Sequence, residues 1–228
     1  MRCIHCEERC TSSHAEAGFE ELEKHLCAVC LRVLAKMERP DQDRLLERLM
    51  LSGNFDHDHP ISAAYTFQKE GLVQAIIHHF KFFGMPRLAR KCGHILARSF
   101  EQELQHIDHI LPVPLHRTRI STRGYNQSDQ LALGMSDVLK KPILGQRHSK
   151  RLRPTESQTK LSIEERRNNV KGAFALKPKT AKLVSGKRVL IIDDVLTTGA
   201  TIASFGEAVE QARPKSIQYL AFAVADFD

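Results

Sequence analysis

Apolar residues along this chain follow two different periods. The run Val189–Ile192 is continuous and rich in β-branched residues, which is typical of a strand buried on both faces of a parallel sheet. In Gly71–Phe83, by contrast, apolar residues recur with the spacing of one helix face. The whole pattern predicts strands at 63–67, 108–113, 143–144, 188–193 and 216–224, and helices at 41–51, 71–83, 86–105, 126–139 and 201–212. Because strands alternate with helices, we predict an α/β fold with a parallel, doubly wound sheet.

A polar segment rich in turn-forming residues predicts a domain boundary. The segment Ser52–Pro60 is rich in Gly, Asn, Asp, His and Pro, so we place the boundary there and interpret its two histidines, His57 and His59, as part of a solvated linker. Residues 1–38 are too few to build a core of their own. The predicted units are a cysteine-rich module with its following helix, capped by Asp41, at 1–51, and a main domain at 61–228, with first helices in 61–105 and a core in 106–228.

Six cysteines include two close pairs. Cys3 and Cys6 form one Cys-x2-Cys pair and Cys27 and Cys30 form the other, a spacing that favours a tetrahedral four-thiolate zinc site. A reducing cytosol argues against disulfides. With four protein ligands the coordination shell is closed, so we expect structural zinc. Alternative ligands remain open at this stage: Cys10, His5, His14 and His25.

The residues that follow the apolar run at 189–192 give the most specific indication of a ligand site. Asp193 and Asp194 stand where the strand is expected to leave the sheet, at the crevice where open α/β folds bind ligands. A turn then leads into a helix N-terminus, which favours an anion. The turn contains Thr197, Thr198, Gly199 and Thr201. Carboxylates accept hydrogen bonds from sugar hydroxyls, and threonine and glycine donors suit a phosphate. The segment therefore predicts a ribose 5-phosphate site, and without Gly-Lys-Ser/Thr it is not a Walker A loop.

Arginines follow another predicted strand end. Pro112 and Pro114 stiffen the exit of the strand at 108–113, and the next residues carry Arg117, Arg119 and Arg123. A guanidinium can bond two phosphate oxygens at once. We predict a stiff loop that presents these donors, followed later by a polar, basic cover over the site at 151–174.

Charge and hydropathy narrow the class of partner. The formal net charge is +7, but residues 111–190 hold 18 Lys and Arg against 5 Asp and Glu, a net +13. Such a concentration favours a polyanion, either a pyrophosphate ligand or a nucleic acid. No apolar stretch reaches the roughly 20 residues of a membrane span, and the N-terminus does not read as a signal peptide. We expect a cytoplasmic protein, with peripheral association at the inner membrane left open.

Several motifs together resemble one family. The four-cysteine head, Val-Pro-Leu before Arg-Gly-Tyr-Asn-Gln, Arg-x-Thr-x-x-Gln, Glu-x-Arg-x-x-Asn-Val-x-Gly-Ala-Phe and Asp-Asp-Val-x-Thr-Thr-Gly-Ala-Thr occur in the order seen in the ComF family. Members of this family are competence-associated proteins with a type I phosphoribosyltransferase domain. The resemblance implies that fold, with a hood in 61–105. Ser128 stands where the family tends to have a small apolar residue, and we expect this departure not to touch the ligand motif.

The resemblance also implies roles for individual residues. Asp193 and Asp194 would hold the ribose hydroxyls of phosphoribosyl pyrophosphate (PRPP), and the turn would hold its 5-phosphate. The implied PRPP-binding residues are Asp193, Asp194, Val195, Leu196, Thr197, Thr198, Gly199, Ala200 and Thr201. The implied pyrophosphate loop and cover are Val113, Pro114, Leu115, Arg119, Arg123, Arg153 and Arg166. In this class Mg2+ bridges pyrophosphate and ribose hydroxyls and is held mainly by the substrate.

Three functions fit these motifs. The first is a competence protein that binds PRPP or ribose 5-phosphate and handles single-stranded DNA during uptake, with a helicase-like ATPase of the ComFA type as partner. The basic segment contains only Tyr125 and Phe174 as aromatic residues for base stacking, which weakens this reading. The second is an active phosphoribosyltransferase, although no acceptor pocket or glutaminase-like nucleophile is evident. The third is a sensor in which PRPP gates DNA binding.

Overall fold

Four parallel strands form the centre of the molecule. The computed structural model describes residues 2–10, 19, 22–51, 59–153 and 172–225. Its main sheet has the order β1-β6-β5-β2, and each neighbouring pair runs parallel. These strands are β1 (Ile61–Phe67), β6 (Ser216–Ala225), β5 (Arg188–Leu196) and β2 (His109–Pro112). The predicted α/β fold with a parallel sheet is confirmed. The short strand predicted at 143–144 is a single parallel bridge from Ile143 to Ile110 at the outer edge.

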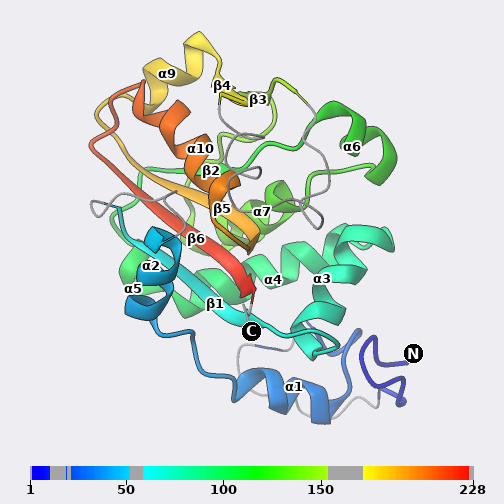
Figure 1. The fold of residues 1–228 in the computed structure, drawn as a ribbon. Helices are drawn as coiled ribbons and strands as arrows, with labels where there is room; N and C mark the ends of the chain where they lie inside the picture. Colours follow the sequence, from blue (N-terminus) through cyan, green and yellow to red (C-terminus); the bar gives the residue numbers. More distant parts are fainter. Residues whose placement is uncertain (1, 11–18, 20–21, 52–58, 154–171, 226–228) are drawn as a thin grey trace.

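Helices cover both faces of this sheet because its side chains alternate between two cores (Figure 1). Leu190 and Ile192 of β5 pack into one core, while Val189 and Ile191 pack into the other. The first core contains α3 (Leu72–Phe82), α4 (Pro86–Ser99) and α7 (Gln127–Leu139); the second contains α10 (Ala200–Glu210) and residues of α2 (Gln42–Leu51) and α9 (Pro178–Val184). As predicted, Asp41 caps α2: its Oδ1 accepts hydrogen bonds from the backbone N–H groups of Asp43 and Arg44, each at 3.0 Å.

Three predicted boundaries are wrong. The helix predicted at 86–105 breaks at Phe100, whose backbone leaves helical geometry while its ring is buried, and only the short α5 (Glu101–Leu104) follows. The loop predicted after Pro114 contains a helix, α6 (Arg117–Arg123). The strand predicted to end at Asp193 continues to Leu196.

Further elements were not predicted. They are α1 (Ala28–Ala35), the helix α9, and a two-stranded antiparallel sheet of β3 (Ser149–Arg151) and β4 (Phe174–Leu176).

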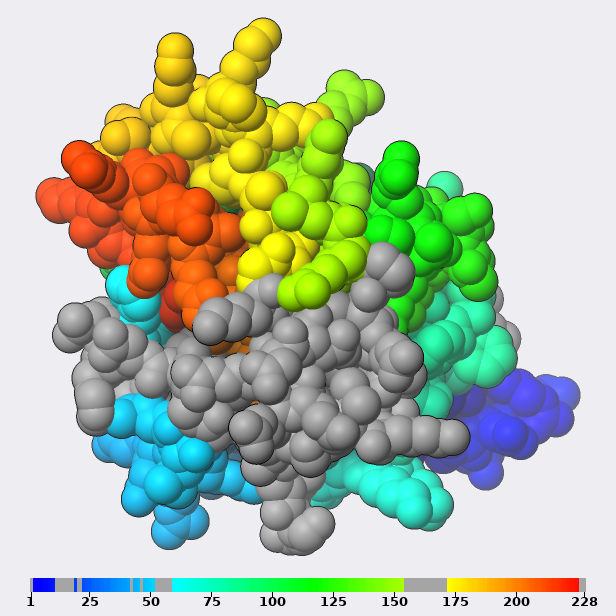
Figure 2. Space-filling model, turned by 45° about the horizontal axis from the view of Figure 1, so that its top comes forward, coloured from blue at the N-terminus to red at the C-terminus, as the bar shows by residue number. Residues whose placement is uncertain are grey.

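The cysteine-rich head shares its core with the main domain. Cys3, Cys27 and Cys30 belong to the same buried cluster as α3 and α4. In both views the N-terminal residues lie beside the part of the chain that contains α3, away from α9 (Figure 1, Figure 2). The division at 52–60 stays a prediction, and β1, assigned to the hood region, is an edge strand of the main sheet. No helix among the described residues has the length and apolar character needed to cross a membrane.

Candidate functional site

Two adjacent carboxylates lie where the sheet opens. Beside β6, the ladder of β5 continues to Leu196, which pairs with Val224. Beside β2 it stops earlier, since the last contact is the N–H of Val113 donating to the carbonyl of Ile192 at 2.9 Å. Asp193 and Asp194 therefore sit within the end of β5, next to the gap that β2 leaves. This is the carboxyl end of parallel strands, where ligands bind in open α/β sheets.

The two carboxylates are buried and differently bonded. The Ser128 hydroxyl donates to Oδ1 of Asp193 at 2.9 Å, and the backbone N–H of Asp194 donates to the same oxygen at 2.9 Å. Lys81 Nζ lies 3.0 Å from Oδ1 of Asp194. The expectation that Ser128 does not touch the ligand motif is wrong. Its hydroxyl donates a hydrogen bond to the Asp193 carboxylate, which an apolar side chain at this position could not do. The other oxygen of Asp194, Oδ2, is buried without a hydrogen-bond partner among the described residues.

This arrangement raises the pKa of Asp193 to about 7, mainly through burial and secondarily through the neighbouring Asp194 carboxylate. The nearby Lys81 ammonium and the Ser128 hydroxyl act in the opposite direction. A buried pair of carboxylates with one unpartnered oxygen lacks hydrogen-bond donors. Hydroxyl groups of a ligand can supply them.

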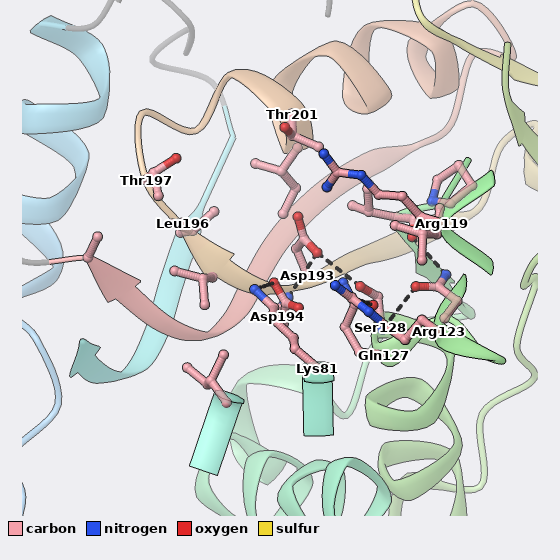
Figure 3. Close-up of a pocket in the computed structure, with 18 of the residues that line it drawn as sticks. Lys81, Arg119, Arg123, Gln127, Ser128, Asp193, Asp194, Leu196, Thr197 and Thr201 are labelled. Carbon is pink, nitrogen blue, oxygen red and sulfur yellow. Dashed lines mark hydrogen bonds and ion pairs between the residues drawn. The ribbon is translucent and has the colours of Figure 1, made fainter. Parts of the chain in front are cut away.

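A tight turn connects β5 to α10. Gly199 has φ +72°, a left-handed conformation that favours glycine, and α10 begins at the next residue. Thr197, Gly199 and Thr201 line a cavity of about 380 Å3 together with both acids (Figure 3). Thr198 and Ala200 are buried and do not line it. The first N–H groups of an 11-residue helix therefore lie beside this cavity, an arrangement that favours a phosphate.

Basic residues line the same cavity. From the predicted pyrophosphate loop, the structure places there Val113, Pro114, Leu115, Arg119 and Arg123. The Asn126 side-chain amide donates to the carbonyl of Val113 at 3.0 Å, which holds the loop to the start of α7. Arg123 donates to the Gln127 side chain. Burial lowers the pKa of Arg123, and nearby Asp194 opposes this effect.

The structure also brings in one residue outside every predicted site segment and one that the predicted cover contained without singling it out. Lys81 comes from α3 and Arg151 from β3, and both line the cavity. Burial and nearby Arg119 lower the pKa of Arg151 to about 10. Arg153 is exposed and does not line the cavity, while Arg166 lies outside the described residues. Arg151 lay in the basic segment that predicted a cover, but nothing in the sequence distinguished it from Arg153 or linked Lys81 to the acids.

The four predicted thiols form a candidate metal centre. The Sγ atoms of Cys3, Cys6, Cys27 and Cys30 all lie within 4.8 Å of one another. Cys6 Sγ is 3.6 Å from the Sγ atoms of both Cys27 and Cys30. A tetrahedral ion with metal–sulfur bonds of about 2.3 Å requires sulfur atoms about 3.8 Å apart, so the cluster fits zinc and is too open for a disulfide.

The alternative ligands lie outside this group. His5 Nδ1 is 3.4 Å from Cys30 Sγ, next to the cluster, while Cys10 and His25 are not members of it. His14 lies outside the described residues.

The sequence around the cavity is similar to that of a known domain family. Residues 84–225 match the phosphoribosyl transferase domain family. The chain belongs to this family. The matched region starts just before α4 and ends with β6, so it contains both acids, the turn and the arginines.

Relatives extend the comparison to the ComF family. Competence protein F of Haemophilus influenzae is 33% identical over 151 residues, which cover 64% of this chain and 65% of that protein. DNA utilization protein YhgH of Escherichia coli K12 is 32% identical over 151 residues, 64% of each chain. Competence protein ComFC of Bacillus subtilis is 22% identical over 191 residues, 80% of this chain and 70% of that protein. The match thus spans less than two thirds of the first two relatives. With the cysteine cluster, these matches confirm membership of the ComF family.

Proposed function

We propose that this protein binds PRPP or ribose 5-phosphate in the cavity at the end of β5, and that it acts on single-stranded DNA during DNA uptake. One observation supports the ligand most directly. Two buried carboxylates and the N-terminus of α10 line the same cavity as Arg119, Arg123 and Arg151. The ligand must therefore combine hydroxyl donors with more than one anionic group, as PRPP does.

The ligand parts divide among these residues by their chemistry. Asp193 and Asp194 would accept hydrogen bonds from the ribose hydroxyls, and the Thr197–Thr201 turn would donate to the 5-phosphate. The arginines would balance the pyrophosphate. Mg2+ would be held mainly by the ligand, since it keeps few protein ligands in such sites. The cavity volume of about 380 Å3 lies within the usual range for small-ligand sites.

The DNA role rests on different observations. The net +13 of residues 111–190 suits a polyanion, and the names of the relatives refer to competence and DNA utilization. Bound zinc in the four-thiolate cluster would stabilise the head against α3 without taking part in chemistry, since all four positions are protein ligands.

Calorimetric titration tests the ligand proposal. We expect PRPP with Mg2+ to bind the wild type, and the double variant Asp193→Asn, Asp194→Asn to lose at least ten-fold in affinity, because neutral amides accept less strongly. Asp43→Asn, at an exposed position on α2, is the matched control and should bind like the wild type. Unchanged affinity in the double variant would refute the site. Pyrophosphate release over a panel of amines and bases tests the alternative function, an active transferase.

The salt dependence of oligonucleotide binding tests the DNA role. Binding of an oligothymidylate should weaken steeply between 50 and 200 mM salt, because neutralised phosphates release counterions. Absence of binding at low salt would refute the DNA role without affecting the PRPP site.

A further inference from the structure

Two aromatic side chains at the end of α3 are exposed. Phe82 and Phe83 are 66% and 67% exposed, and they are the only strongly exposed aromatic residues in the part of the chain that the structure describes. The other phenylalanines with described burial are largely enclosed, as in the cores around Phe80 and Phe222. Phe82 lines the cavity and Phe83 follows it directly, so a ligand at the cavity can contact open aromatic surface there.

The rings are held in place. His79 stacks on Phe83 with centroids 4.8 Å apart, and His78 meets Phe82 edge to face at 5.3 Å. The Tyr125 hydroxyl donates to the carbonyl of Phe80, which ties the end of α3 to the corner before α7. The platform, which we define as Phe82 and Phe83, is therefore braced before any ligand arrives, and little conformational entropy would be lost on binding.

Basic side chains lie beside Phe82. The Arg123 guanidinium lies 5.4 Å from the centroid of the Phe82 ring. Phe82 and His78 line the same cavity as Arg119, Arg123 and Lys81. His78 therefore lines the cavity as well as packing against Phe82. PRPP would engage the arginines but has no aromatic ring, so it leaves the exposed rings without a function.

We propose that Phe82 and Phe83 form a stacking platform for bases of single-stranded DNA, with Arg123 contacting a phosphate of the same strand in molecules that hold no PRPP. The proposal rests on the DNA role above and assigns a place to it. Every base has a π face, so stacking on an aromatic ring binds a strand without requiring a particular sequence. A neighbouring cation adds attraction to the phosphates and to the ring itself.

The tertiary structure places exposed aromatic rings beside the basic segment, which has none available for stacking. Phe174 is buried against Phe205, and Tyr125 uses its hydroxyl to bond the end of α3, so neither is open for stacking. The platform comes from the end of α3, outside the basic segment, and Arg123 of that segment lies over the Phe82 ring. Aromatic and basic groups are thus adjacent in space although more than 30 residues separate them along the chain.

The absence of tryptophan from the chain permits a direct test. Phe82→Trp introduces a single tryptophan at the platform, whose emission can be followed. Titration with an oligothymidylate should quench its emission to saturation, whereas an oligomer of equal length with abasic sugars should not. Leu183→Trp, at an exposed site on α9, is the matched control and should show no quenching.

Affinity gives a second measurement. The double variant Phe82→Ala, Phe83→Ala should bind the oligothymidylate at least ten-fold more weakly than the wild type, and bind the abasic oligomer equally well. Thermal melting checks that the variant folds. If the wild type binds no oligonucleotide, the DNA role fails. If it binds but the emission of the Phe82→Trp variant is not quenched and the double variant binds normally, the platform is refuted while the DNA role stands, and a protein partner becomes the remaining occupant of the exposed rings.

Discussion

The close contact between α4 and α7 predicts that one added methyl group will destabilise the protein. Helices α4 and α7 approach at Gly93 and Gly134. A Cβ on Gly134 would lie 1.9 Å from the carbonyl oxygen of Arg90, and one on Gly93 would lie 2.1 Å from that of Leu131. Ordinary contacts begin near 3.4 Å. Both obstacles are backbone atoms of regular helices, so Gly134→Ala requires the helices to move apart by more than 1 Å, by order of magnitude about 1.5 Å.

The net effect combines two opposing terms. Alanine favours a helix over glycine by about 1 kcal/mol. Overpacking costs about 1–3 kcal/mol, and more where backbone must shift, as it must here. We expect Gly134→Ala to lower the free energy of unfolding by about 2 kcal/mol, which corresponds to a fall in Tm of about 4–8 °C for a chain of this length.

The same displacement should reach the ligand site. Helix α7 carries Ser128, whose hydroxyl bonds Asp193 at 2.9 Å, and a shift of about 1.5 Å would break this bond. PRPP affinity should therefore fall together with stability. Urea unfolding and calorimetric titration measure the two effects.

Two comparisons sharpen this test. Gln130→Ala, a half-buried position on the same helix, should change stability by no more than about 0.5 kcal/mol. The double variant Gly93→Ala, Gly134→Ala should cost less than the sum of the single variants, because one separation of the helices relieves both clashes. A Gly134→Ala protein as stable as the wild type would show that α4 and α7 do not make this contact.

Three further predictions follow from the two sites. Arg151→Gln should weaken PRPP binding at least ten-fold while Arg153→Gln leaves it unchanged, because only the first lines the cavity; equal effects in calorimetry would contradict this placement. Asp193 has a folded pKa of about 7 against 3.8 in the unfolded chain, so the folded state binds the extra proton and its stability falls as pH rises through this window. Asp193→Asn should therefore gain stability relative to the wild type in urea unfolding at pH 8 compared with pH 5, by no more than about 3 kcal/mol, and a constant difference would argue against the raised pKa. Purified protein should contain one zinc ion per chain by elemental analysis; Cys27→Ser should lose it and melt at a lower temperature, whereas Cys10→Ser should retain it, and loss in both would place Cys10 among the ligands.

Most strands and long helices could be predicted because their signals are local. The apolar run of β5 and the helical spacing of α3 and α7 reflect which side chains each element buries. Helix α6 had no such signal, since none of its residues is buried; it begins at the His116 cap and ends at Gly124, with φ +84°. The end of β5 was misplaced because its backbone stays paired with β6 as far as Leu196, opposite Val224, and the polar residues Asp193 and Asp194 carry no local signal of that pairing.

The sequence by itself determined the parts of the sites that are contiguous. The acids, the threonine turn and the cysteine pairs each carry their chemistry within a few residues, so spacing alone revealed them. Tertiary structure decided which distant side chains complete them. Lys81 and Ser128 reach the acids from two different helices, and Phe82 meets Arg123 across a helix corner. The physical reason is that these contacts depend on how helices pack on the sheet, which no local periodicity encodes. The carboxylates and the turn indicate a ribose phosphate, and the packing of α3 against the start of α7 places an aromatic surface beside it.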